Sequence, residues 1–215
     1  MDKIQVLKPK YRTEEILKEI QECLDTSWTG MGGKAIEFEE KWKDYADFEH
    51  AHFLQSATAG LHLALKVFKE KYGWEDGDEI ITTPLTFVST NHAIMYENLK
   101  PVFADVDDSL CLDPDSILSN ITDKTRAVMF VGIGGREICN LQNIPLILDA
   151  AHLAGTQTMR VYPQYQAMTQ SQVGWDADVS VFSFQAVKNL PTADSGMVCF
   201  KDEEDDKLAR QLSWL

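Results

Sequence analysis

Residues 178–190, DVSVFSFQAVKNL, carry an apolar run into a segment that contains a lysine, Lys188. The valines and phenylalanines of the run are typical of a buried strand. Lysine is rarely buried without a partner. Lys188 is therefore either an exposed loop residue or a lysine retained for its chemistry, and the segments around it decide between the two.

Strand-like and helix-like segments alternate along the chain. This alternation predicts an α/β layered fold with a mostly parallel sheet, and the nearly continuous apolar strands predict helices on both faces. Residues 136–143 leave too little chain for a helical crossover between two strands, so we expect a tight loop or a compressed helix there. Strands are predicted in 50–56, 79–84, 100–106, 126–132, 144–150, 178–184 and 195–200, and helices in 13–24 (after a Thr13 cap), 34–48, 57–73, 86–99, 113–121 and from 202 on.

Composition excludes several classes of protein. The 215 residues are 44% hydrophobic, enough for a substantial core, and the net charge of −14 argues against a nucleic-acid surface. We find neither a membrane-spanning run nor a signal peptide, and the four cysteines form no C-x-x-C pair, so we expect a reduced, cytoplasmic protein without a metal site. His50 and His52 alternate as strand neighbours do, but a structural role is favoured over metal binding.

Candidate functional groups follow the predicted strands. In an open α/β sheet, ligands bind beyond the carboxyl ends of the strands. The small residues 57–60, ATAG, open a helix there and suit an anion, while Phe87, Asp149 and Lys188 follow three other strands. Each feature alone has a structural explanation: a helix start, a core aromatic, a turn residue and a solvated lysine. Together they match pyridoxal phosphate, which needs a phosphate cradle, a stacking surface, a carboxylate for the pyridine nitrogen and an amine for the aldehyde.

Five blocks, in order, carry a resemblance to the DegT/DnrJ/EryC1/StrS sugar aminotransferases, which belong to the fold-type-I pyridoxal-phosphate enzymes. They are SWTGMGGKAIEFEEKW, QSATAGLHLAL, GDEIITTPLTFVSTNHAI with KPVFADVD, LILDAAHLAGT, and DVSVFSFQAVKNLPTADSGMVCF. The resemblance implies an aspartate-aminotransferase-like large domain, a three-layer α/β/α sandwich. Residues 1–30 would form an N-terminal helix and substrate-side loop, and 31–215 the cofactor-binding large domain, without the family's C-terminal small domain.

The resemblance also implies a role for each matching residue. Lys188 would be the catalytic lysine that bonds to the cofactor aldehyde, and Asp149 would pair with the pyridine nitrogen. Phe87 would stack on the ring, and Thr29 would approach the substrate. The remaining cofactor-binding residues would be Ala57, Thr58 and Ser183 at the phosphate and His152 near the ring hydroxyl.

The implied reaction transfers an amino group from an amino acid, taken to be glutamate, to a nucleotide-linked keto sugar. A truncated, non-catalytic remnant that still binds cofactor or dimerises is the alternative, favoured by the missing small domain and by departures such as ADSG where the family has GEGG. A nicotinamide site at GIGGRE fails because Glu137 breaks the G-x-G-x-x-G spacing. Lys188 argues against the family's dehydratases, which carry histidine there.

The resemblance further implies a homodimer, because relatives complete each site with residues of the partner. Large apolar residues that one domain would struggle to cover support this expectation. A core position is the alternative for Trp42. The candidates are Trp28, Met31, Trp42 and Trp74, whereas residues 201–207, KDEEDDK, are expected to be a solvated helix start.

Overall fold

A seven-stranded sheet organises the chain in a computed structural model that describes residues 8–135, 144–162, 167–172 and 176–213. The strand order is β1-β9-β8-β5-β4-β2-β3, and β9 alone runs in the direction opposite to the other six strands. The predicted mostly parallel sheet is therefore confirmed. Its strands are β1 (His52–Leu54), β2 (Glu79–Thr82), β3 (Lys100–Phe103), β4 (Thr125–Val131), β5 (Leu146–Asp149), β8 (Val179–Ser183) and β9 (Gly196–Phe200).

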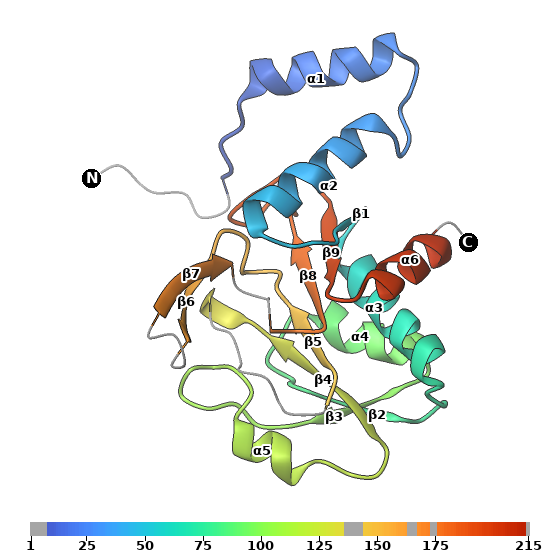
Figure 1. The fold of residues 1–215 in the computed structure, drawn as a ribbon, viewed down its shortest axis with the longest axis vertical. Helices are drawn as coiled ribbons and strands as arrows, with labels where there is room; N and C mark the ends of the chain where they lie inside the picture. The colour runs from blue at the N-terminus through green and yellow to red at the C-terminus, as the bar shows by residue number, and fades with distance from the viewer. Residues whose placement is uncertain (1–7, 136–143, 163–166, 173–175, 214–215) are drawn as a thin grey trace.

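Helices cover both faces of this sheet (Figure 1). Met129 of β4 packs in one core, with residues of α3, α4 and α6, while the next residue, Phe130, packs in the other, with residues of α2 and α5. Successive side chains of a strand point to opposite faces, so a strand buried on both faces builds two cores. The helices are α1 (Thr13–Asp25), α2 (Gly33–Ala46), α3 (Ala57–Tyr72), α4 (Val88–Tyr96), α5 (Pro114–Ser119) and α6 (Glu203–Leu212), with a 3₁₀ turn at Ile133–Gly135.

A close contact between β9 and α3 shapes the edge of the sheet where the site lies. A Cβ atom on Gly196 would lie 2.5 Å from the backbone nitrogen of Ala57 and 2.6 Å from the carbonyl carbon of Ser56. Only glycine avoids a clash with backbone at this distance. Gly196, the one glycine kept from the family's GEGG sequence, therefore lets β9 start directly against the first turn of α3.

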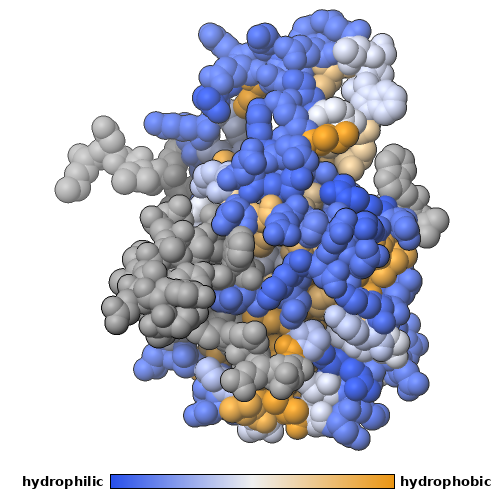
Figure 2. All heavy atoms as spheres, in the orientation of Figure 1, coloured by the Kyte–Doolittle hydropathy of each residue, from blue (hydrophilic) through white to orange (hydrophobic). Residues whose placement is uncertain are grey.

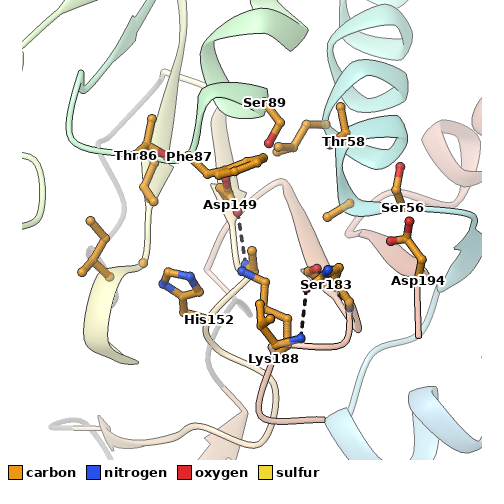
Figure 3. A pocket seen from close by; sticks show the side chains of 18 residues that line it. Ser56, Thr58, Thr86, Phe87, Ser89, Asp149, His152, Ser183, Lys188 and Asp194 are labelled. Carbon is orange, nitrogen blue, oxygen red and sulfur yellow. Dashed lines mark hydrogen bonds between the residues drawn. The ribbon is translucent and has the colours of Figure 1, made fainter. Parts of the chain in front are cut away.

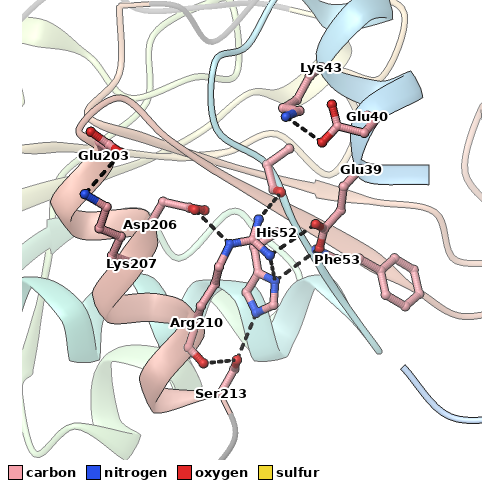
Figure 4. A network of polar contacts seen from close by, with 11 residues as sticks. Glu39, Glu40, Lys43, His52, Phe53, Glu203, Asp206, Lys207, Arg210 and Ser213 are labelled. Atoms are coloured by element: carbon pink, nitrogen blue, oxygen red, sulfur yellow. Dashed lines mark hydrogen bonds and ion pairs between the residues drawn. The ribbon is translucent and has the colours of Figure 1, made fainter. Parts of the chain in front are cut away.

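A buried polar network fastens α6 to α2 and β1 (Figure 4). Arg210 donates to Asp206 at 2.8 Å, to Glu39 at 3.1 Å and to the carbonyl oxygen of Ala51 at 2.7 Å. His52 lies 3.2 Å from Glu39 and 2.9 Å from the Ser213 hydroxyl. His52, one of the two alternating histidines, thus has the structural role that the sequence favoured.

The acidic start of α6 is only partly solvated, so the prediction for residues 201–207 was wrong at two positions. Asp205 and Asp206 are 3% and 8% exposed. Each carboxylate has a cationic partner, since Lys71 lies 2.7 Å from Asp205 and Arg210 lies 2.8 Å from Asp206. A run of acids looks solvated in sequence, but α3 supplies the cation beside Asp205, and Arg210, one turn further along α6 itself, supplies the cation beside Asp206.

The N-terminal helix also departs from expectation. Thr13 does not cap α1; the cap position is Arg12, without a side-chain hydrogen bond. No residue of α1 is buried, and Leu17, within its apolar stripe, is 59% exposed. Helical periodicity identifies an apolar face but not the surface that covers it.

Two of the four large residues proposed for an interface are core residues. Trp42 and Trp74 are 2% and 8% exposed, whereas Trp28 and Met31 are 62% and 41% exposed. Trp42 packs edge-to-face on Phe182 of the central sheet. The core alternative for Trp42 is therefore confirmed, and Trp74 joins the opposite core.

An antiparallel strand pair was not predicted. Strands β6 (Gln157–Tyr162) and β7 (Ala167–Gln172) form a separate two-stranded sheet. Their sequences, QTMRVY and AMTQSQ, lack the apolar runs by which the other strands were identified. The predicted tight connection at 136–143 lies outside the described residues.

The surface is mostly hydrophilic on the face drawn in Figure 2, in keeping with the excess of acids. Among the helices that the structure describes, none is both long and apolar enough to cross a membrane. The described residues also contain no group of three or more histidine, cysteine, aspartate or glutamate side chains that could hold a metal ion.

Candidate active site

A cavity of about 530 Å³ lies at the carboxyl edge of the parallel strands. Its lining comes from the start of α3, the start of α4 and the segments that follow β4, β5 and β8. Figure 3 shows polar and charged side chains from these segments around the cavity. All seven residues predicted to bind the cofactor are in the lining: Ala57, Thr58, Phe87, Asp149, His152, Ser183 and Lys188.

The first turn of α3 forms one side of the cavity. Ser56 caps this helix by accepting a hydrogen bond from the amide of Ala59 at 3.2 Å. Ala57 and Thr58 follow in the first turn, whose amides have no partner within the helix and carry the positive end of its dipole. With the hydroxyl of Ser183 at the end of β8 on the same side (Figure 3), this part of the cavity suits an anion.

Asp149, the last residue of β5, is buried with 5% exposure. One carboxylate oxygen accepts from the Thr90 hydroxyl at 2.7 Å, and the other accepts from the amide of Ala151 at 3.1 Å. Burial raises the pKa of Asp149, while the hydrogen bonds from Thr90 and Ala151 oppose this shift. The arrangement holds one carboxylate in a fixed orientation at the edge of the cavity.

Lys188 lies in the segment after β8, held by backbone hydrogen bonds. Its amide donates to the carbonyl oxygen of Gln185 at 2.8 Å, and the amide of Ala186 donates to Ala193 at 2.8 Å. Burial lowers the pKa of the Lys188 amine, and the charge of Asp149 opposes this shift. A lowered pKa increases the fraction of free amine, which is the nucleophilic form. Among the described residues that line the cavity, Lys188 is the only lysine.

His152 and Phe87 complete the lining near Asp149 (Figure 3). Burial, followed by the charge of Lys188, lowers the pKa of His152 and favours its neutral form. Phe87 is 76% exposed although it lines the cavity, so its ring is open to a flat ligand. The aromatic and the carboxylate therefore stand at one site, as a pyridine ring requires.

The departures from the family sequence also lie at this cavity. Gln185 and Asp194 are part of its lining. Ala193 has φ of 100°, a region that favours glycine, and stands where the family's GEGG begins. The alanine therefore adds backbone strain next to the lysine segment.

Thr29 is not brought to this cavity. It lines a separate groove between α1 and α2, with Lys34 and Trp28 among its neighbours. Its predicted approach to the substrate stays a prediction. Thr90, in contrast, was not identified from the sequence. It follows Phe87 at the start of the same predicted helix, and the expectation that Phe87 and Asp149 share one site could have indicated it.

The residues present fit pyridoxal phosphate. A helix start for an anion, an open aromatic face, a buried carboxylate and a lysine with a lowered pKa surround one cavity. These features, on this sheet, are those of the large domain of a fold-type-I pyridoxal-phosphate aminotransferase. The chain belongs to the DegT/DnrJ/EryC1/StrS aminotransferase family, whose profile matches residues 10–214.

Individual relatives agree with this assignment. The chain is 37% identical over 210 residues to the spore coat polysaccharide biosynthesis protein SpsC of Bacillus subtilis (strain 168), covering 93% of this chain and 50% of SpsC. It resembles the structure of DesI with its TDP-sugar product (30% identity, TM-score 0.80, 97% of this chain and 52% of DesI). It also resembles the sugar aminotransferase Spr1654 of Streptococcus pneumoniae in its PLP form (27% identity, TM-score 0.82, 98% and 57%).

These comparisons confirm the predicted family, fold class and cofactor type. Spr1654 has been solved in PLP and PMP forms, and pyridoxal phosphate is the cofactor of the family. The chain spans about half the length of the curated relatives that it matches. The boundary predicted between residues 30 and 31 stays a prediction.

Proposed function

We propose that this chain is the cofactor-binding part of an enzyme that transfers an amino group from an amino acid, glutamate, to a nucleotide-linked keto sugar. The observation that carries the proposal is the convergence of Lys188 and Asp149 on one cavity with the first turn of α3. The sugar follows from the relatives, since DesI was solved with a TDP-sugar product and SpsC acts in polysaccharide biosynthesis. We further propose a cytoplasmic location, on the sequence features given above.

In this proposal, each residue contributes a distinct physical effect. The amides of Ala57 and Thr58, with Ser183, bind the phosphate, while Phe87 orients the ring and His152 lies near its hydroxyl. Asp149 holds a proton on the pyridine nitrogen. Pyridoxal phosphate, when bound, supplies the electron sink that stabilises a carbanion. Lys188, as the free amine, is the group that accepts and returns a proton at the reacting carbon.

The transfer predicts a half-reaction that can be followed by absorbance. Protein loaded with pyridoxal phosphate and then mixed with glutamate should lose its visible absorption and release 2-oxoglutarate in equal amount. D-Glutamate, the mirror image of the proposed donor, is the matched control and should leave the spectrum unchanged. Cofactor binding without release of the keto acid would support the non-catalytic remnant instead, and no cofactor binding would contradict both readings.

We propose that the chain forms a homodimer across the mouth of the cavity. Val187 lines the cavity, yet it remains 47% exposed. Exposed apolar side chains at the edge of a polar site are typical of an interface, because a partner surface would remove them from water.

The dimer predicts a concentration-dependent mass in light scattering. Val187→Asp should shift the protein toward the monomer, whereas Leu118→Asp, on α5 and 62% exposed, should not. A wild-type monomer at all concentrations that still binds cofactor tightly would contradict the proposal.

A further inference from the structure

Asp149 is the end point of a chain of hydroxyl groups. The Thr86 and Thr90 hydroxyl oxygens lie 2.8 Å apart, and the Thr90 hydroxyl donates to Asp149 at 2.7 Å. Thr90 is fully buried in α4, and Thr86 stands at the edge of the cavity. Two hydroxyl groups thus connect Thr86, in the cavity wall, to the Asp149 carboxylate.

The direction of these hydrogen bonds follows from the charge of the carboxylate. An ionised carboxylate only accepts, and each hydroxyl has one proton to donate. Thr90 must therefore give its proton to Asp149, and the bond between the two threonines must run from Thr86 to Thr90. Bonds aligned in this way polarise one another and stabilise the negative charge at the end of the chain.

A buried carboxylate requires hydrogen bonds of this kind to remain charged. Burial raises the pKa of Asp149, and the hydrogen bond from Thr90 is the foremost effect that lowers it again. The remaining donor to the carboxylate among the described contacts is the amide of Ala151 at 3.1 Å. Loss of Thr90 would leave one carboxylate oxygen desolvated without that partner.

We propose that Thr86 and Thr90 are positioning residues that keep the Asp149 carboxylate charged and oriented toward the ring nitrogen of the cofactor. The inference rests on the proposed function, because it concerns how the same site holds a proton on that nitrogen. A charged Asp149 carboxylate keeps the proton on the ring nitrogen. A carboxylate whose charge is no longer stabilised by hydrogen bonds draws that proton toward itself. The two threonines would thereby set the strength of the electron sink without contacting the reacting atoms.

The test uses pyridoxal phosphate labelled with ¹⁵N at the ring nitrogen, bound to the full chain. In wild-type protein the ¹⁵N chemical shift should report a protonated ring. In Thr90→Val, a near-isosteric change, it should move toward the unprotonated value. The acid limb of kcat should move up by about one pH unit, and kcat should fall roughly tenfold with little change in KM. Thr90→Ser, which keeps the hydroxyl, should restore the wild-type ¹⁵N shift and the wild-type kcat with its pH dependence.

A matched control separates this effect from the loss of any buried hydroxyl. Thr82, in β2, is also fully buried and donates to Asn91 of the same helix at 3.2 Å, without touching Asp149. Thr82→Val should therefore leave the ¹⁵N shift at its wild-type value. Thr86→Val should change it in the same direction as Thr90→Val but less, and this variant carries the test if Thr90→Val does not fold.

The outcomes separate the proposed role of Thr86 and Thr90 from the proposed function. A protonated ring in the wild type and an unchanged ¹⁵N shift in Thr90→Val, or in Thr86→Val if Thr90→Val is unfolded, would overturn the role of the two threonines and leave the proposed function intact. An equal shift in Thr82→Val would also overturn it, because the effect would then come from packing. Failure of the wild type to bind the cofactor would overturn both proposals.

Discussion

Lys188→Ala is expected to abolish covalent attachment of pyridoxal phosphate and to reduce amino-group transfer by at least about 10⁴-fold. Two functions that we propose for Lys188 would be lost together, that of the nucleophile that bonds to the aldehyde and that of the amine that moves the proton. The position matters because burial lowers the pKa of this amine, so that more of it is uncharged than for an exposed lysine. Borohydride reduction followed by mass spectrometry of the peptides measures the attachment directly.

A matched lysine provides the control for Lys188→Ala. Lys201 is exposed and follows β9, which runs against the other strands, so it lies at the opposite edge of the sheet. Lys201→Ala should keep the reduced adduct and the wild-type rate. An adduct on any lysine other than Lys188, or an unchanged spectrum in Lys188→Ala, would show that the assignment is wrong.

Asp149→Asn is expected to lower the rate of transfer by roughly a hundredfold or more, while cofactor affinity changes much less. The first turn of α3, where we propose that the phosphate binds, is unchanged, so most of the proposed contacts to the cofactor would be kept. The neutral amide, however, cannot hold a proton on the ring nitrogen. Equilibrium dialysis and stopped-flow absorbance measure the two quantities separately.

Stability provides the control for Asp149→Asn. Because burial raises the pKa of Asp149 in the folded protein, its ionisation costs folding free energy as the pH rises through that pKa. The amide removes this cost, so the cofactor-free variant should unfold at the wild-type temperature or above it at pH 7. A loss of cofactor binding as large as the loss of rate would contradict the electron-sink role.

Most of the sheet, and the convergence of four segments on one edge of it, were predictable because the signals are local. Strands that are buried on both faces read as apolar runs, and the carboxyl ends of parallel strands meet at one edge. Phe87, Asp149 and Lys188 could therefore be placed together from their positions after three strands. The pair β6–β7 was not predicted because neither strand contains a continuous apolar run, and the structure shows it through the pairing of two strands that are neighbours in sequence.

By itself, the sequence determined the seven strands of the main sheet and the helices around it, because their signals are local, and a resemblance over five blocks indicated the family and the candidate residues that line the cavity. Only the tertiary structure decided which polar groups share a partner. Thr90 became part of the site because α4 packs beside the end of β5, and Asp205 could be buried because α3 brings Lys71 to it. Such pairings depend on distances between segments far apart in sequence, because a hydrogen bond or ion pair forms only where packing brings its two groups together.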